Sequence, residues 1–365
     1  MKYILSSFLL WRILLVIFSI ISINIIPLRI GFLGGGLENY LKNPLIWGWA
    51  NMDGMHYLSI AQNGYFQYEQ AFFPLYPLLI RFFILFTGGN FLLSGLLVSH
   101  LFFIGSLVVL YYLLKLDYPS TKANWVIFLL LGFSTSFFFV SVYSESLFLF
   151  LTLCAVYFTR KKKWYMASFF ALFAGATRLM GIFLVPLIAY EIWKQKTKIR
   201  LINLFPLLIS SLGLIFYMVY LKITVNDPLF FFHAQPAFGA NRSGNKLIFL
   251  PQVIFRYIKI FVTSTINYDY LIALFEFLMI IITIYILIKN IYKIRVSYQI
   301  FAWLSLLTPT LTGSLSSIPR YILTIFPFFI ALSLEKNLIK YIFLIINASL
   351  LIILTMYFFR GYFVA

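Results

Sequence analysis

The sequence predicts an all-α protein that crosses a membrane many times. Hydrophobic residues make up 62% of the 365-residue chain, charged residues only 10%, and the mean hydropathy is +0.97. A soluble domain carries about 25% charged residues, so this chain has too few to cover a water-facing surface. Apolar stretches of about 18 residues or more recur from end to end, and each is a candidate membrane helix.

The basic residues between these stretches indicate the orientation, because lysine and arginine beside membrane helices favour the cytoplasmic side. The clusters lie at 115–122, 160–163, 194–200, 289–295 and 336–340. If all five are cytoplasmic, an even number of crossings separates each neighbouring pair. We therefore expect eleven spans, some too short to cross unaided, with a cytoplasmic N-terminus and an external C-terminus. The expected spans lie near 5–27, 90–114, 124–141, 145–159, 164–177, 180–193, 201–222, 270–289, 298–312, 320–334 and 340–358.

The composition also argues against other classes of protein. The net charge is +18, but the basic residues form short clusters between apolar segments, so a nucleic-acid partner is not expected. Residues 4–27 are too long for a cleaved signal and lack a small-residue cleavage site, so they are expected to form an uncleaved anchor. Cys154 is the one cysteine, which excludes a disulfide framework.

The chain shows no repeat and no linker rich in Gly, Ser or Pro, so a single domain over 1–365 is the simplest interpretation. Two long polar segments, 28–89 and 223–268, become outer loops in this topology. Pro74 and Pro77 suit the first turn of a short helix. That helix carries Arg81, so we expect it to lie at the outer membrane interface.

Six of the ten acidic residues fall outside in this topology, which places the functional site there. Asp53 and His56 are three residues apart and share a face of a helical segment. A charge near the centre of a bilayer costs about 3 kcal/mol and usually faces a cavity or a partner. Such a residue can also snorkel to water, a basic loop residue can be merely solvated, and a histidine among phenylalanines can be interface filler. The candidate site residues are Trp49, Asp53, His56, Tyr65, Glu145, Arg178, His233, Gln235, Arg242, Lys246, Arg320 and Tyr321.

An outward-facing carboxylate among arginines suits one kind of chemistry. A carboxylate can take a proton from an attacking hydroxyl, and arginines can bind and neutralise a phosphate leaving group. Both are needed if the substrate is a lipid-linked phosphosugar, with its tail in the bilayer and its head outside. Nucleotide sugars are generally absent there, so a lipid-linked donor is the natural choice.

Five segments together resemble the PIG-V family of mannosyltransferases. Met52-Asp-Gly-Met-His-Tyr-Leu-Ser-Ile-Ala-Gln-Asn-Gly-Tyr65 and Ala71-Phe-Phe-Pro-Leu-Tyr-Pro-Leu78 are similar to the family's first blocks. Tyr143-Ser-Glu-Ser-Leu-Phe148, Ala176-Thr-Arg-Leu-Met-Gly181 and Pro319-Arg-Tyr-Ile-Leu-Thr-Ile-Phe-Pro327 resemble later blocks in the same order. The resemblance covers about residues 45 to 330.

The resemblance implies a GT-C glycosyltransferase fold with a long first outer loop, juxtamembrane helices and an essential acid in that loop. By it Asp53 is the general base, the donor is a polyprenyl- or dolichyl-phosphate sugar, and the anomeric centre inverts without a covalent intermediate. The segment 74–86 would be a juxtamembrane helix. Met52 stands where the family usually has tryptophan. The shorter chain and its Ile, Phe, Lys and Asn bias indicate a bacterial member in the plasma membrane, whose acceptor is a glycolipid, a cell-wall glycopolymer or a protein. Asn241 begins a glycosylation sequon that has no meaning without an endoplasmic reticulum.

The resemblance and the charges together suggest a role for each candidate residue. Arg178 and Arg320 hold the phosphate, with Arg242 as a contribution from the second loop. Glu145, His56 and His233 orient sugar hydroxyls or support Asp53. The other substrate-binding candidates are Tyr65 and Trp49, which would pack on the sugar ring, together with Gln235 and Tyr321.

No cofactor is expected. Carboxylates and His56 could ligate a divalent metal, but their spacing is not a metal signature. Two rival functions stay open, a lipid-sugar flippase or transporter and a catalytically inert subunit of a glycosylation complex. A transporter often shows two related halves, and none is visible here.

Overall fold

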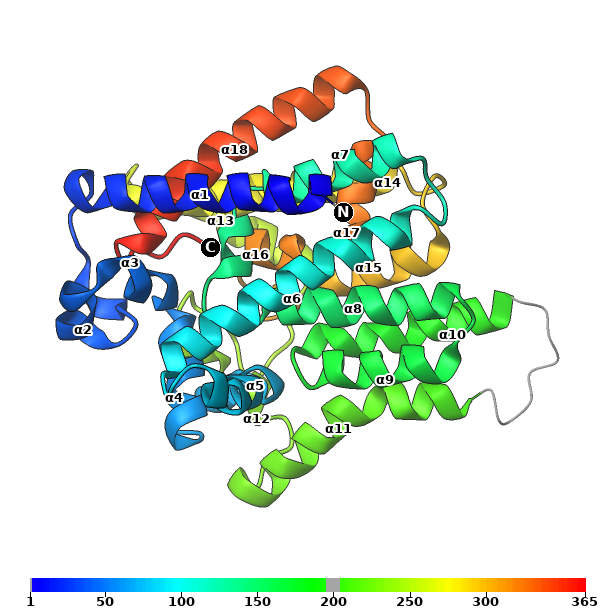
Figure 1. The fold of residues 1–365 in the computed structure, drawn as a ribbon, viewed down its shortest axis with the longest axis horizontal. Coiled ribbons are helices and arrows are strands. Elements are labelled where there is room, and N and C mark those ends of the chain that lie inside the picture. The colour runs from blue at the N-terminus through cyan, green and yellow to red at the C-terminus, as the bar shows by residue number, and fades with distance from the viewer. Residues whose placement is uncertain (1, 195–203) are drawn as a thin grey trace.

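The computed structural model describes residues 2–194 and 204–365 (Figure 1). Within those ranges the chain forms helices and turns without a β-strand, and one isolated parallel bridge joins Ile248 to Thr312. The predicted all-α class is therefore confirmed for the described part. Three members of one basic cluster, Lys196, Lys198 and Arg200, lie outside the described residues, as does the start of the predicted span 201–222.

Five of the described helices are long and apolar enough to cross a bilayer. Each has 21 to 24 residues, and about 20 are needed at 1.5 Å per residue. They coincide with five of the predicted spans, so the protein is a multi-pass membrane protein. These helices are α1 (Lys2–Ile25), α6 (Phe91–Leu114), α11 (Phe205–Val225), α14 (Tyr268–Lys289) and α18 (Asn337–Phe359).

The remaining helices are shorter, and the predicted total of eleven crossings stays a prediction. They are α2 (Gly36–Lys42), α3 (Pro44–Trp47), α4 (Asp53–Asn63), α5 (Leu75–Phe83), α7 (Ser120–Leu131), α8 (Glu145–Arg160), α9 (Trp164–Gly175), α10 (Leu184–Lys194), α12 (Phe230–His233), α13 (Leu250–Thr263), α15 (Val296–Thr310), α16 (Ile318–Leu323) and α17 (Phe326–Ser333).

Three predicted helices are broken in the structure. The helix expected at 124–141 ends at Leu131, and a 3-10 turn follows at Ser136–Val140. The one expected at 180–193 begins as a 3-10 turn before α10. The helix expected at 320–334 divides into α16 and α17 because Pro327 has no N–H with which to continue a helix from α16, and it is tolerated in the first turn of a new one.

The first predicted outer loop carries the expected short helices α2 to α5. Helix α5 begins directly after Pro74 and continues through a 3-10 turn to Phe86, which matches the bounds of the helix predicted at 74–86. Its position at the membrane interface stays a prediction. The second loop contains α13, which the sequence reading missed. It buries Val253 and Tyr257 on one face.

The largest fully buried side chains of the helical core are aromatic. Helices α1 and α18 lie side by side along one edge, while α8, α9 and α11 form the opposite part of the molecule (Figure 1). Helices α9 and α11 approach closely at Gly213, where a Cβ atom would lie 1.8 Å from the Leu172 carbonyl oxygen. The contact therefore requires glycine. Between α7 and α8, Phe137, Phe138 and Phe139 are fully buried, and the chain then turns into the site.

Candidate functional site

Asp53 lies where the first loop docks on the core. Its backbone N–H donates to the Tyr143 hydroxyl (3.1 Å), and that hydroxyl donates to the Asn51 carbonyl (3.0 Å). The Asn51 side chain accepts the Gly34 N–H (3.1 Å) and donates to the carbonyls of the last two residues of α18 (2.9 and 3.1 Å). Between them, Met52 has a φ of 58°, an unusual conformation for a residue with a side chain. The acid is thus fixed by contacts from distant parts of the chain.

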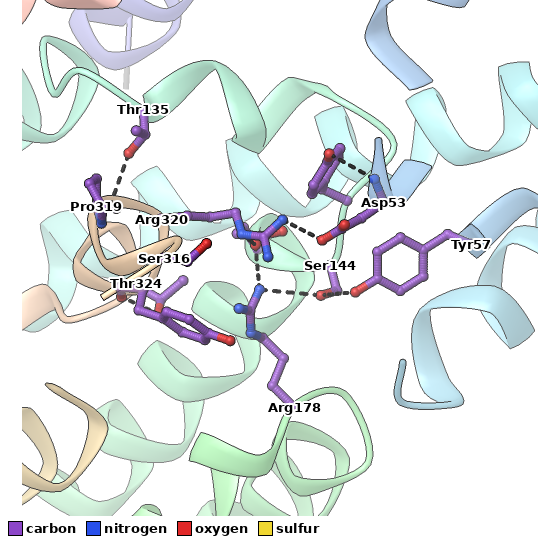
Figure 2. A network of polar contacts seen from close by, with 12 residues as sticks. Asp53, Tyr57, Thr135, Ser144, Arg178, Ser316, Pro319, Arg320 and Thr324 are labelled. Atoms are coloured by element: carbon purple, nitrogen blue, oxygen red, sulfur yellow. Dashed lines mark hydrogen bonds and ion pairs between the residues drawn. The ribbon is translucent and has the colours of Figure 1, made fainter. Parts of the chain in front are cut away.

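Two arginines and two acids form the centre of the site (Figure 2). Arg320, on α16, pairs with Asp53, and Arg178 pairs with Glu145. The two pairs adjoin, because Arg320 Nε lies 3.5 Å from Glu145 Oε1. Arg178 also reaches Ser144 Oγ at 3.5 Å, and Ser144 shares a 2.9 Å hydrogen bond with the Tyr57 hydroxyl. Residues from α4, α8, α16 and the turn after α9 therefore form one polar network.

The network is buried but open at Asp53. The Glu145 side chain is 1% exposed and those of Arg178 and Arg320 are 11% exposed, whereas Asp53 is 27% exposed. Both acids begin helices, where the partial positive charge of the N-terminus favours a carboxylate. Burial by itself raises the pKa of Asp53, but the Arg320 guanidinium brings that pKa below its ordinary value. Asp53 is therefore an ionised carboxylate at neutral pH.

Part of the network's hydrogen-bonding capacity is unused. Glu145 Oε2 and Arg320 Nε are buried and make no hydrogen bond. Buried polar atoms are nearly always satisfied, so such exceptions need an explanation. Aromatic rings cover the arginines, with Tyr321 5.2 Å from the Arg178 guanidinium and Tyr143 5.5 Å from that of Arg320. The network therefore has hydrogen-bonding capacity left for a further polar ligand.

His56 forms a second pair beside Asp53. Its Nδ1 lies 3.0 Å from Glu69 Oε1, and Glu69 also accepts the Phe66 N–H (3.0 Å). Burial raises the pKa of Glu69, but the bonds from His56 and Phe66 bring it below its ordinary value. The His56 ring stacks on Phe72 at 5.1 Å and meets the edge of Phe238 at 5.5 Å. Its ring orientation is therefore fixed.

The second long loop brings Arg242 and Gln235 close to the segment that precedes α16. Arg242 lies 3.4 Å from Ser316 Oγ and 3.5 Å from Gln235 Oε1. The Ser243 N–H donates to the Thr312 carbonyl (2.7 Å). The loop is thereby attached to the segment that leads into α16 and Arg320.

Other candidates lie elsewhere, and these placements correct the sequence interpretation. Trp49 is 2% exposed and packs between Phe359 and the Arg12 guanidinium, 4.1 Å from its ring, so no face is left for a sugar. His233 pairs with Asp227 at 2.6 Å and its side chain is 39% exposed, which makes it a surface residue.

Tyr65 and Lys246 are also outside the network. Tyr65 donates to the Phe72 carbonyl (2.8 Å), and its ring lies against Tyr217 and Tyr220, away from Asp53. Lys246 is exposed, and its side chain is accounted for by solvation. The motif shows that Tyr65 is near Asp53 in the sequence, but it does not show toward which neighbours the Tyr65 ring points.

Several contributing residues were not anticipated from the sequence. Tyr57, Tyr143 and Ser144 lie inside the motifs already noted, and their hydroxyl groups were the available signal. Glu276 on α14 is 3% exposed and accepts the Ser317 N–H and the Tyr257 hydroxyl, both at 2.9 Å. It stabilises the turn before Arg320, and its signal was an acid within an apolar helix.

Among the described residues, no three His, Cys, Asp or Glu side chains are close enough together to hold a metal ion. The carboxylates of the network are already paired with arginines. The expectation that no cofactor is needed stays a prediction.

Comparison with known proteins gives one match. The family model described as "Mannosyltransferase (PIG-V)" matches residues 1–207, more than half of the chain. No curated protein and no solved structure matches. The matched range contains Asp53, Glu145 and Arg178, which form the two central ion pairs with each other and with Arg320 of α16, and it also contains His56. The chain therefore belongs to the PIG-V mannosyltransferase family, which supports a glycosyltransferase activity for it.

Proposed function

We propose that this protein transfers a hexose, mannose by its family, from a polyprenyl-phosphate donor to a hydroxyl group of an acceptor outside the cytoplasm. The observation that carries the proposal is the buried network around Asp53, in which two arginines meet two acids and part of the polar capacity is unused. Family membership supports the class of reaction. The donor, the acceptor, the inverting mechanism and the GT-C architecture are our proposals.

The proposed step is a single displacement. The acceptor oxygen attacks C1 of the sugar as Asp53 takes its proton, and the bond from C1 to the phosphate oxygen breaks. A sugar–oxygen bond forms with inversion, and polyprenyl phosphate leaves with the bonding electrons. Arg178 and Arg320 neutralise the phosphate, since guanidinium groups form paired hydrogen bonds to phosphate oxygens. When Arg320 turns to the phosphate, Asp53 is released to act as a base.

The neighbours of the network receive supporting roles in this proposal. Glu145 holds Arg178 in the orientation needed by the phosphate, and Arg242 supplies a third cation from the second loop. His56, fixed by Glu69, binds a sugar hydroxyl or supports Asp53. No cofactor takes part, and the chain acts in a bacterial plasma membrane with a cytoplasmic N-terminus and the site on the opposite side.

The test uses the purified full chain in detergent with polyprenyl-phosphate mannose and candidate glycolipid, glycopolymer and peptide acceptors. Wild type transfers sugar, Asp53→Asn does not, and the exposed control Asp269→Asn retains activity. A cooperative thermal unfolding transition in both variants excludes misfolding. Activity that survives a chelator supports the absence of a metal.

Other outcomes would overturn the proposal. Movement of lipid across vesicles without transfer indicates a flippase. The lack of both activities, for every acceptor, indicates a non-catalytic subunit. Transfer that retains the anomeric configuration contradicts the single displacement.

A further inference from the structure

A cavity of about 480 Å³ lies between the first loop and the membrane helices. Helices α4 and α5 form one wall, and α9 and α11 form the other. Its surface is almost entirely apolar, with aromatic rings from Phe173, Phe216 and Tyr220. Arg81 is the one charged residue that lines it in the described structure, and its Nε donates to the Ala61 carbonyl at 2.8 Å. The cavity therefore suits a hydrocarbon ligand.

The cavity and the polar network share a wall. Along α4, Asp53, Tyr57 and Ile60 follow each other at helical spacing and lie on one face. Tyr57 bonds to the network through Ser144, and Ile60 lines the cavity one turn later. The Phe72 ring packs against the Tyr57 ring, with 5.1 Å between the ring centres.

The second shared wall is the end of α9. Ala176 lines the cavity and precedes Arg178 by two residues. Its carbonyl accepts the Leu75 N–H at 3.1 Å, which joins α9 to the start of α5. A ligand bound by Arg178 would therefore contact a residue only two positions from one that lines this cavity.

The cavity also accounts for motif residues that the chemistry leaves unused. Gly64 and Tyr65 end the first motif, and Pro74 and Pro77 belong to the second. All four line the cavity. Tyr65 points its hydroxyl at the Phe72 carbonyl and presents its ring to the cavity wall.

We infer that this cavity binds the first isoprene units of the donor's polyprenyl chain. The inference rests on the proposed function. If Arg178 and Arg320 hold the phosphate, the lipid bonded directly to that phosphate must begin beside them, and Ala176 brings this cavity within two residues of Arg178. An acceptor hydroxyl carries no such constraint. The apolar walls stabilise a bound hydrocarbon in proportion to the area removed from water.

The test is a binding measurement that does not depend on transfer. Native mass spectrometry of the full chain in detergent compares farnesyl phosphate with dodecyl phosphate, which has the same headgroup on an unbranched chain. The variant Leu78→Trp fills the cavity from α5, where Leu78 is 56% exposed. Leu208→Trp is the matched control, because Leu208 on α11 is 63% exposed and does not line the cavity.

We expect Leu78→Trp to weaken farnesyl phosphate binding about ten-fold, as the loss of a few buried methylene contacts implies, and Leu208→Trp to leave it unchanged. Phe216→Ala, which removes an aromatic wall, serves as a second variant if Leu78→Trp fails to fold. Stronger binding of farnesyl than of dodecyl phosphate supports an isoprenoid occupant. If farnesyl phosphate and dodecyl phosphate bind equally well and neither cavity variant changes that binding, the lipid is an adventitious additive only. That result overturns the inference.

The two proposals fail in different ways. If wild type transfers sugar and Leu78→Trp does not change the dependence on donor chain length, the proposed lipid site is wrong and the proposed transferase activity stands. If Leu78→Trp weakens farnesyl phosphate binding but the protein transfers no sugar, the lipid site stands and the proposed transferase activity is wrong.

Discussion

The two ends of α8 carry two ion networks of the same composition. At its first residue, Glu145 belongs with Asp53, Arg178 and Arg320. At its last residue, Arg160 pairs with Asp117, and Arg295 bridges Asp117 and Glu191 at 3.3 and 3.7 Å. The ends of this 16-residue helix are about 22 Å apart. Each network contains two acids and two arginines from distant parts of the chain.

The networks differ in what they leave unbonded. In the second one, Arg160 donates to Asp117 and to the Tyr298 hydroxyl (3.1 Å), and Ser297 donates to Glu191 (2.5 Å). In the described structure, none of its side-chain atoms is buried without a hydrogen-bond partner, whereas Glu145 and Arg320 each have one such atom. Two acids and two arginines can therefore either connect helices or bind a ligand. The unused hydrogen bonds distinguish the two.

The sharpest test of this comparison removes one carboxylate from each network. Asp53→Asn should lower kcat about 10³-fold, because general-base catalysis contributes about 10²–10⁴. Asp117→Asn should leave kcat within about two-fold while lowering the melting temperature, since a satisfied surface pair contributes only to stability. Transfer assays and thermal melts of both variants measure this. A comparable fall in kcat for Asp117→Asn would remove the distinction.

The next test exchanges one arginine for lysine in each network. Arg320→Lys should lower kcat about 10²-fold, the usual loss when one donor to a developing anion is removed, because lysine keeps the charge but not the two-pronged donor. Arg295→Lys should be nearly silent. Saturation kinetics with the polyprenyl-phosphate donor decide the point. A change confined to KM for Arg320→Lys would show that the group binds donor without favouring the transition state.

A third test concerns stability. Glu145→Gln leaves a buried Arg178 without its counter-ion, and breaking such a pair destabilises by about 3 kcal/mol. Glu191→Gln faces the one-third exposed Arg295 and keeps an acceptor for Ser297, so the loss should be below about 1 kcal/mol. Thermal unfolding in detergent measures both. Equal losses would contradict the difference in burial on which this prediction depends.

The smallest effects should appear on acidification. Burial raises the pKa of Asp117, but Arg160 and Arg295 bring it below its ordinary value, as Arg320 does for Asp53. Both carboxylates therefore contribute stability that is complete above the ordinary aspartate pKa of about 3.9 and is lost as pH falls through the lower folded values. The acid limb of kcat/KM should likewise lie below about 3.9, and Arg320→Gln should move it upward. A limb that Arg320→Gln leaves in place would show that Asp53 is not the titrating base.

Sequence reasoning recovered the membership of the first network better than its pairings. Glu145, Arg178 and Arg320 were grouped with Asp53 because the topology placed them on one side, although Asp53 and Arg320 are 267 positions apart. The pattern of charges could not say which arginine meets which acid. The pairings depend on how α4, α8, α16 and the turn after α9 meet in the folded protein, which helical periodicity alone does not predict.

Aromatic residues were harder to place. Trp49 and Tyr65 both lie near Asp53 in sequence, but one is covered by Arg12 and Phe359 and the other faces a cavity. Their environments are set by helices α1, α18 and α11, which no local pattern around residue 50 contains. The spacing of a motif therefore gave the face of α4 correctly and the partners of its flanking rings incorrectly.

The attachment of Asn51 to the end of α18 has a consequence for biogenesis. Asn51, which precedes Met52 and Asp53, donates two hydrogen bonds to carbonyl groups at the end of α18. A chain in which α18 has not yet entered the bilayer lacks those two bonds, and the unusual backbone at Met52 loses part of its support. Asp53 therefore reaches the position described here only once α18 is in place.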